Sequence, residues 1–120
     1  MEITGTLNSE LVRYLDLNTR QIQLTASNMA NIDTPGYRAV GMDFEAEMKQ
    51  AMRSIDAGTA LHNPKVAEVD GLVVRPDGND VSMDRESLNL AEAQLRFKVG
   101  VALLKNQFSG IMSAIHADAK

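Results

Sequence analysis

The amino-acid sequence predicts a mainly α-helical protein, in which long helices at both ends pack as a coiled coil or helical bundle around a small central insert. Apolar residues recur at steps of four and three along both ends of the chain, which is the spacing of a coiled-coil seam. Aromatic residues make up only 4% of the chain, Trp is absent and Met occurs seven times. A core of aliphatic residues and Met is typical of helix–helix packing, because Met adapts to irregular neighbours.

The chain of 120 residues is long enough for one modest core. We therefore expect one assembly unit in three parts. A long N-terminal helix should span residues 1–32, a central segment residues 33–83, and a second long helix residues 84–120.

The first helix carries a seven-residue repeat of the kind that forms a coiled-coil seam. Its members are Leu11, Leu15, Asn18, Ile22, Thr25, Met29 and Ile32. Two of these positions, Asn18 and Thr25, are polar. The simplest interpretation is the buried face of a bundle helix, and the alternative is that the polar positions set the register against one partner.

A turn should end this helix at Thr-Pro-Gly-Tyr, residues 34–37. Pro35 disfavours helical geometry in the residue before it, and Gly36 can adopt the positive φ that the third residue of a type II turn needs. Asn28 and Asn31 lie just before the turn, where their amides can bind the reversing backbone. A polar helix face with a frayed end is the alternative.

The central segment should contain a short helix and a β-hairpin. Asp43 is placed to cap the helix and Gly58 to end it. The apolar side of this helix consists of Phe44, Met48, Met52 and Ile55. An Asp-Gly pair then separates residues 65–69 from residues 72–75, which predicts a hairpin because Asp-Gly favours two-residue turns. A Pro-Asp-Gly-Asn turn leads into the last helix.

The last helix should begin after Ser82 as N-cap and present a broad apolar face. Its main seam is Leu90, Phe97, Val101, Leu104, Phe108, Ile111 and Ile115, and a second line is Leu88, Leu95, Val99 and Leu103. A face this wide predicts contact with at least two other helices. Gly100 and Gly110 each cost about 1 kcal/mol relative to Ala in a helix, so they indicate either close approach of a neighbour or bends.

Few residues in the chain have the chemistry of a catalytic or metal site. There is no Cys, and the only two imidazoles, His62 and His116, have no carboxylates at metal-ligand spacing. Residues 77–80 lack the ligand order of a calcium loop, so a turn is the better interpretation. No nucleophile motif or phosphate-binding loop is present. The sequence therefore predicts a protein that is not an enzyme and that uses no cofactor, metal or small-molecule substrate.

The charge distribution argues against nucleic acid as a partner. Residues 33–83 carry nine acidic and five basic groups, which accounts for the formal net charge of −4, and no basic stripe is present. The longest uninterrupted apolar run, residues 101–104, is far too short to span a membrane. The N-terminal residues do not have the pattern of a cleavable signal peptide, so these observations alone favour the cytoplasm.

Two motifs give the chain a resemblance to a known family. Residues 27–38, Ser-Asn-Met-Ala-Asn-Ile-Asp-Thr-Pro-Gly-Tyr-Arg, resemble the rod-type signature of bacterial flagellar axial proteins. Residues 75–86, Arg-Pro-Asp-Gly-Asn-Asp-Val-Ser-Met-Asp-Arg-Glu, are similar to a segment characteristic of the proximal-rod subunit among the short rod proteins. The one departure is Asp80, where a second Asn is more usual.

The resemblance implies a structural subunit of the flagellar basal-body rod, the driveshaft between membrane ring and hook. It implies a place in the periplasmic rod and export by the flagellar type III apparatus without a cleavable signal peptide, which replaces the cytoplasmic expectation. It also implies that other rod subunits, the membrane-ring/rod junction protein and the export apparatus are partners. Terminal segments of such proteins generally become helical on assembly.

The resemblance also suggests which residues serve assembly. The signature residues are Asn28, Asn31, Thr34, Pro35, Gly36 and Tyr37. The subunit-packing seam is Leu11, Leu15, Ile22, Met29, Phe97, Val101, Leu104, Phe108, Ile111 and Ile115. A soluble helical adaptor or export chaperone, a small enzyme and a sibling rod subunit are the alternatives. Residues 75–86 argue against the sibling, and the lack of convergent polar groups argues against the enzyme.

Overall fold

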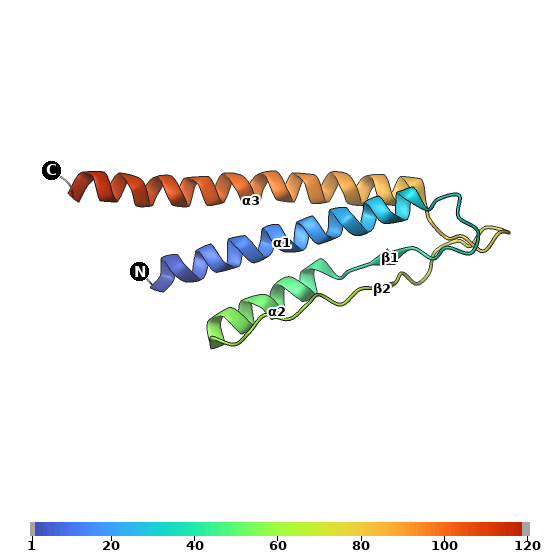
Figure 1. Cartoon of the computed structure of the whole chain (residues 1–120), viewed down its shortest axis with the longest axis horizontal. Helices are drawn as coiled ribbons and strands as arrows, with labels where there is room; N and C mark the ends of the chain where they lie inside the picture. The colour runs from blue at the N-terminus through green and yellow to red at the C-terminus, as the bar shows by residue number, and fades with distance from the viewer. Residues whose placement is uncertain (1, 119–120) are drawn as a thin grey trace.

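The computed structural model describes residues 2–118 of the chain, and the side chains of residues 5–117. The described elements are α1 (Glu2–Ala30), β1 (Val40–Gly41), α2 (Phe44–Ala57), β2 (Ala67–Glu68) and α3 (Met83–Asp118). The molecule is a slender body of 70 × 27 × 16 Å, in which α1 and α3 run antiparallel along the long axis (Figure 1). The prediction of a mainly α-helical protein with long terminal helices and a small central insert is confirmed.

Helix α1 lies between the other two helices and contacts both (Figure 1). Because it has neighbours on two sides, its buried residues extend beyond the predicted seam. Leu11, on that seam, is buried, and so are Leu17 and Leu24, which form a second line seven residues apart. The seam therefore describes only part of the buried surface of α1.

The two polar seam positions each make one hydrogen bond within α1, while Oδ1 of Asn18 is buried without a partner among the described residues. Asn18 Nδ2 donates to the carbonyl of Tyr14 at 2.9 Å, and Thr25 Oγ1 accepts from Gln21 Nε2 at 3.3 Å. Both side chains are fully buried. Inside one chain they make no polar contact that would set the register of α1 against α2 or α3, so register-setting against another molecule stays a prediction.

Helix α3 approaches α1 closely at Gly100. A Cβ atom at this position would lie 2.7 Å from Cδ2 of Leu15 and 3.0 Å from Cδ1 of Tyr14. Gly100 and Ala93, one heptad earlier, are buried small residues that let the two helices come together. A Cβ at Gly110 would meet nothing within 4 Å, so close approach explains only the first of the two glycines.

Among the described residues, α1 is the only helix whose backbone lies close to the wide apolar face of α3. Among the described elements α3 packs along α1, and it reaches α2 through the Arg96 guanidinium, which lies 4.7 Å from the Phe44 ring centre. Within the single chain α3 thus packs along one helix and touches a second only through Arg96, so packing of its wide face against at least two helices stays a prediction. Residues of both predicted lines stay exposed: Leu88, Leu95, Phe97, Val99, Leu103, Phe108 and Ile115.

The short helix of the central segment is confirmed at both ends. The Asp43 carboxylate accepts a hydrogen bond from the Ala46 amide at 3.0 Å, which is the geometry of an N-cap. Gly58 adopts φ +70° and its amide donates to the carbonyl of Ile55, which ends the helix in a left-handed residue.

The predicted β-hairpin is wrong. Residues 67–68 form β2, but this strand pairs antiparallel with β1, with Val40 opposite Glu68 and Gly41 opposite Ala67. Asp70 and Gly71 form a bend, and residues 72–75 form no strand. The reason is that residues 72–74 project past the helix ends, where a second strand would have no core to cover, whereas β1 is held against α1. A short hairpin without a packed face is marginal in water.

The connection between α2 and β2 is fastened to the helices by side chains. Arg13 of α1 donates to the carbonyl of His62 at 2.7 Å, and the amide of Lys65 donates to Glu47 of α2 at 3.0 Å.

None of the helices described in residues 2–118 combines the length and apolar character needed to cross a membrane.

Candidate functional site: the junction of the two motifs

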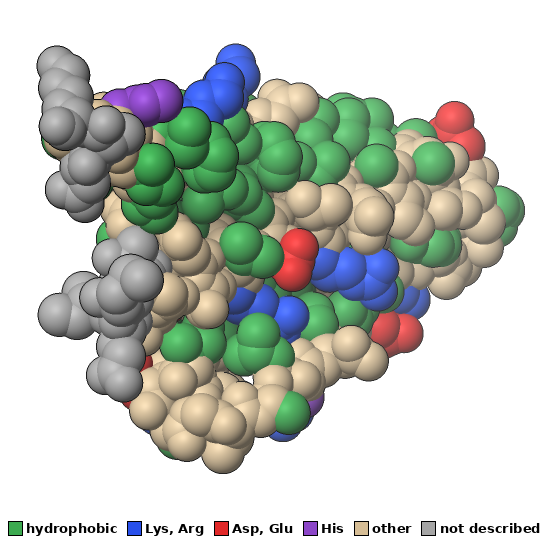
Figure 2. Space-filling model, turned by 60° about the vertical axis from the view of Figure 1, so that its left-hand side comes forward, with side chains coloured by type: hydrophobic (Ala, Val, Ile, Leu, Met, Phe, Trp, Pro, Cys, Tyr) green, Lys and Arg blue, Asp and Glu red, His purple; other side chains and the backbone are tan. Residues whose placement is uncertain are grey.

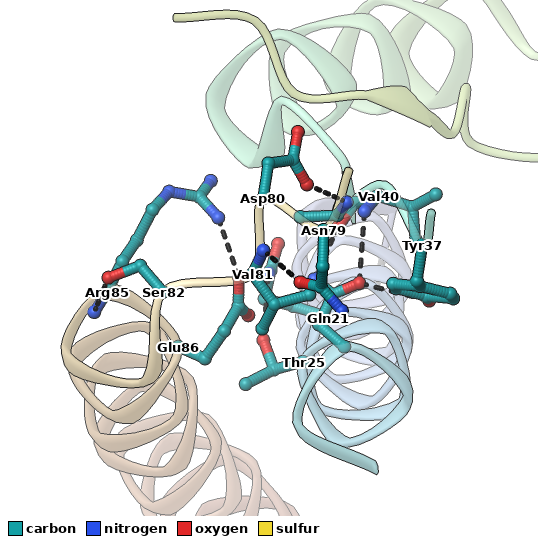
Figure 3. Close-up of polar contacts among 12 residues, drawn as sticks. Gln21, Thr25, Tyr37, Val40, Asn79, Asp80, Val81, Ser82, Arg85 and Glu86 are labelled. Atoms are coloured by element: carbon teal, nitrogen blue, oxygen red, sulfur yellow. Dashed lines mark hydrogen bonds and ion pairs between the residues drawn. The ribbon is translucent and has the colours of Figure 1, made fainter. Parts of the chain in front are cut away.

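The two sequence motifs, residues 27–38 and 75–86, meet at one end of the molecule, where α1 ends and α3 begins (Figures 1 and 3). We call this region the junction. The first motif makes the predicted turn: the amide of Tyr37 donates to the carbonyl of Thr34 at 3.2 Å, and Gly36 adopts φ +75°. The expected helix stop is therefore present, with glycine at the position that requires a positive φ.

Asn28 holds the chain that returns after the turn. Its Nδ2 donates to the carbonyl of Val40 at 2.8 Å, and its Oδ1 accepts from the amide of Val40 at 3.0 Å. The side-chain amide thus pairs with β1 as a neighbouring strand would. The hydroxyl of Tyr37 also donates to Asn28 Oδ1, at 3.3 Å. Asn28 binds the reversing backbone as expected, although its partner is β1 and not the turn.

Asn31 secures the turn itself. Its Nδ2 donates to the carbonyl of Ser27 at 2.8 Å in the last turn of α1, and its Oδ1 accepts from the Thr34 hydroxyl at 3.1 Å. The frayed helix end that the sequence allowed is absent here, since both amides of the signature are engaged.

Asn79, a residue of the second motif, binds the carbonyl groups at the end of α1. Its Nδ2 lies 2.9 Å from the carbonyl oxygen of Asn31, 3.0 Å from that of Ile32 and 2.9 Å from that of Thr34. Its Oδ1 accepts from the amide of Val81 at 2.8 Å. Carbonyls at a helix end have no partner within the helix, and this fully buried side chain supplies one. Sequence reasoning treated Asn79 as a turn residue only.

Asp80 binds the strand side of the junction. Its carboxylate accepts from the amide of Ala39 at 2.6 Å and lies 3.8 Å from Nε of Arg38, while its own amide donates to the carbonyl of Tyr37 at 3.3 Å. Figure 3 shows Asn79 and Asp80, from the segment that leads into α3, side by side next to Tyr37 and Val40. Asp80, which stands where similar proteins more usually have Asn, is therefore buried and contacts the basic side chain of Arg38.

Two glycine turns pack back to back at the centre of the junction. The amide of Gly36 donates to the carbonyl of Asp77 at 2.9 Å. A Cβ on Gly78, which adopts φ +86°, would lie 3.3 Å from Cα of Gly36. Arg75 spans the same contact, since its guanidinium donates to the carbonyls of Val81 and Ile32.

The first turn of α3 completes the junction. The Ser82 hydroxyl accepts from the amide of Arg85 at 3.3 Å, which confirms Ser82 as the N-cap. Glu86 is buried and lies 2.7 Å from Nη1 of Arg85, so its charge is paired (Figure 3). The amide of Glu86 also donates to the carbonyl of Ser82.

The junction is built to hold geometry. Its carboxylates and amides are occupied by backbone and side-chain groups of the same chain. Residues 2–118 contain no group of three or more acidic or imidazole side chains placed to hold a metal. What the arrangement does is fix the angle at which α1 ends, β1 departs and α3 begins. Met29 belongs to the first motif, and the other seam residues lie outside residues 27–38 and 75–86, along α1 and α3.

Comparison with known proteins gives one consistent answer. The chain is 36% identical over 119 residues to the flagellar basal body rod protein FlgB of Salmonella typhimurium, with 84% of this chain and 86% of that protein covered. FlgB of Yersinia enterocolitica is 30% identical (84% and 87% covered), and FlgB of Cereibacter sphaeroides is 34% identical (87% and 89% covered). No family model matches the chain.

The fold, the junction and these relatives define a structural subunit of the bacterial flagellar basal-body rod. The resemblance at residues 27–38 and 75–86 is thereby confirmed. Within that class, the chain belongs to the family of the flagellar basal body rod protein FlgB. Its place is the flagellar basal body, in association with other rod components.

Proposed function

We propose that the chain is a proximal-rod subunit that polymerises through its terminal helices into the driveshaft between membrane ring and hook. The observation that carries the proposal is the apolar surface that α3 leaves open in the single chain. Leu88 is 60% exposed, Leu95 64% and Phe108 63%, although all three belong to the apolar lines of α3 that were expected to be buried. Leu88, Leu95, Val99 and Leu103 follow one line of the helix, and an exposed apolar line of this kind marks an interaction site.

The length of α3 supports the same proposal. With 36 residues it is about 54 Å long at 1.5 Å per residue, and its C-terminal end runs past the start of α1 (Figure 1). Figure 2 shows hydrophobic side chains gathered over this part of the molecule. A lone helix extension is marginal in water, so neighbouring subunits are the natural source of its packing. The seam residues of α1 and α3 and the signature residues of the junction would then serve subunit packing and subunit geometry.

The finer assignments belong to the same proposal. They are the periplasmic rod as location, export by the type III apparatus without a cleavable signal peptide, and contact with the membrane-ring/rod junction protein. They are supported by the named place of the relatives in the basal body and by the signature residues. A structural subunit of this kind would have no catalytic role, no cofactor and neither nucleic acid nor a small molecule as partner.

The test is complementation with localisation. A strain that lacks its own FlgB should regain motility when it expresses this chain with an epitope tag, and the tag should copurify with isolated basal bodies. Leu95→Asp should abolish both results while the chain is still made. A tagged chain that stays in the cytoplasm, bound to other exported proteins, would support the adaptor or export-chaperone alternative instead.

A further inference from the structure

The chain contains the dipeptide Asp-Gly twice within a short stretch of sequence. Asp70 and Gly71 lie in the loop that follows β2, and Asp77 and Gly78 lie in the junction. Both glycines adopt positive φ, +80° at Gly71 and +86° at Gly78. Glycine has no Cβ that would obstruct its own amide nitrogen, so an aspartate side chain can approach that nitrogen closely. The two pairs therefore share their local chemistry and differ only in their surroundings.

The pair in the junction is held by three contacts. The Asp77 carboxylate accepts from the amide of Asn79 at 3.0 Å, and the amide of Gly78 donates to the carbonyl of Arg75 at 2.8 Å. A Cβ on Gly78 would lie 3.3 Å from Cα of Gly36, so this backbone has little room to move. The carboxyl carbon of Asp77 and the nitrogen of Gly78 can meet only if these contacts open.

The pair in the loop has none of these contacts. Asp70 and Gly71 are both exposed, in a loop that extends beyond the helix ends (Figure 1). Among the contacts of residues 2–118, the Asp70 carboxylate accepts no hydrogen bond and the Gly71 amide donates none. A Cβ on Gly71 would meet nothing within 4 Å. The loop is fastened only outside the pair, through the amides of Val69 and Arg75, which donate to carbonyls at 2.9 and 2.8 Å.

We propose that Asp70 is a site of spontaneous isomerisation to isoaspartate and that the junction protects Asp77 from the same reaction. The amide nitrogen of Gly71 attacks the side-chain carboxyl carbon of Asp70 and releases its proton to solvent. The new C–N bond forms as a C–O bond breaks, and one carboxyl oxygen leaves as water. The product is a five-membered succinimide ring.

A second water molecule then opens the ring at one of its two C–N bonds. Opening at the side-chain carbon restores aspartate, and opening at the main-chain carbon leaves the backbone running through the side chain of Asp70. One water leaves and one water enters, so the composition of the chain is unchanged and no oxidant, reductant or enzyme takes part.

The fold tolerates this change at one pair and not at the other. Isoaspartate adds one methylene to the backbone. The exposed loop can accommodate it, because residues 70–74 form no strand or helix. At Asp77 the same insertion would displace the carbonyl that accepts from the amide of Gly36 at 2.9 Å. This inference goes beyond the proposed rod function and does not depend on it, because its test uses the purified chain alone.

The test compares the two pairs in one peptide. The purified chain is incubated at neutral pH for several weeks and then digested with trypsin. Cleavage after Lys65 and Arg85 gives a single peptide, residues 66–85, because Pro76 protects the bond after Arg75. Electron-transfer fragmentation distinguishes isoaspartate from aspartate at each position. The matched control is a synthetic peptide of residues 66–85, which is incubated in parallel without the rest of the fold.

In the synthetic peptide we expect isoaspartate at both positions in comparable yield. In the folded chain, the yield at Asp70 should exceed that at Asp77 by about tenfold or more, because reaction at Asp77 first requires local opening of the junction. Equal yields at the two positions of the folded chain would overturn the inference. So would absence of isoaspartate at Asp70 in a folded chain whose control peptide reacts at both positions.

A variant of the exposed pair gives an independent measurement. In Asp70→Asn the same attack expels ammonia in place of water, and the loss is read directly from the mass of the peptide. The folded variant should deaminate at position 70 within about threefold of the rate in a synthetic peptide with the same change, because nothing in the fold restrains this loop. A folded variant that reacts about tenfold or more slowly than its peptide would show that the loop is restrained, and the inference would fail.

Discussion

The two ends of the molecule differ in where their side chains find contacts. At the junction, polar side chains are buried and matched to backbone groups of the same chain, as Asn28 is with Val40 and Asn79 is with the end of α1. At the other end, apolar side chains of α3 are exposed and the Asn8 oxygen lacks a donor. The comparison indicates that the polar contacts of the junction are completed within one chain, whereas the apolar face of α3 depends on neighbouring molecules.

This division explains why polar residues form the signature. Apolar residues give stability without direction, whereas a hydrogen bond from an amide to a particular carbonyl fixes the angle between segments. A subunit that repeats along a rod needs one fixed angle between its helices and a surface that packs only on assembly. The junction supplies the first and the wide face of α3 supplies the second.

The largest effect should come from Asn79→Leu. Leucine fills a similar space but removes one donor from three carbonyls at the end of α1, each of which keeps one other donor. It also leaves the amide of Val81 without its acceptor. A buried amide without a partner costs about 1–3 kcal/mol and each lost hydrogen bond about 1 kcal/mol, so we expect the unfolding free energy to fall by about 3 kcal/mol. Urea unfolding followed by circular dichroism measures it. The exposed Asn106→Leu is the control, with a change within about 0.5 kcal/mol, and a loss below that level for Asn79→Leu would contradict the closed junction.

A smaller loss is expected from Gly100→Ala, which tests the close approach of α3 to α1. The new methyl group would lie 2.7 Å from Leu15 and 3.0 Å from the Tyr14 ring, so the helices must shift. Overpacking of this kind costs about 1–3 kcal/mol. Gly110→Ala is the matched control and should instead stabilise the chain by up to about 1 kcal/mol, because its Cβ meets open space. Thermal unfolding of both variants measures the difference, and equal signs would contradict the packing.

Asp80→Asn should have a milder effect. Asparagine keeps an acceptor for the amide of Ala39, but it gives up the charge that lies 3.8 Å from Arg38. Because the Arg38 side chain is 45% exposed, the pair is worth about 0–1 kcal/mol, and we expect a loss near 1 kcal/mol at low salt. The difference between parent and variant should shrink at 1 M salt, where exposed pairs are screened. A salt-independent difference would assign the effect to the buried hydrogen bond alone.

Sequence patterns were sufficient for the elements whose signals are local. The helix from Phe44 to Ala57 has its cap, its apolar side and its terminal glycine within 16 residues, and it was predicted to the residue. The turn at Gly36 was likewise readable, because proline and glycine restrict the backbone where they stand.

The remaining features depend on partners that are distant in the chain. Asn79 caps carbonyls 45 to 48 residues away, and β2 pairs with a two-residue strand that has no periodic signal of its own. The hairpin prediction failed because Asp-Gly permits a tight reversal without requiring one, and the sheet partner was decided by packing against α1. The exposure of α3 depends on whether a second molecule is present, which no pattern within one chain encodes.

The smallest effect on the chain itself should come from Leu95→Asp, which separates folding from assembly. Leu95 is 64% exposed and lies on the second apolar line of α3. Surface substitutions away from buried features change stability by about 0.5 kcal/mol or less, so the purified variant should unfold with the parent. In the rod, the same position would meet an apolar neighbour, and a buried unpaired carboxylate is strongly unfavourable.

The expected result for Leu95→Asp is therefore a normal monomer that restores no motility and is absent from basal bodies. Leu104 is a less suitable position for this test, because it is half-buried between α3 and α1 and its replacement would also perturb the monomer. Glu92→Gln, at an exposed position one turn before Leu95, is the control and should restore motility. A variant Leu95→Asp that unfolds at markedly lower urea would show that this face already packs within one chain. Full motility with an unchanged monomer would show that the face meets no neighbour, and the contrast between the two ends would have to be abandoned.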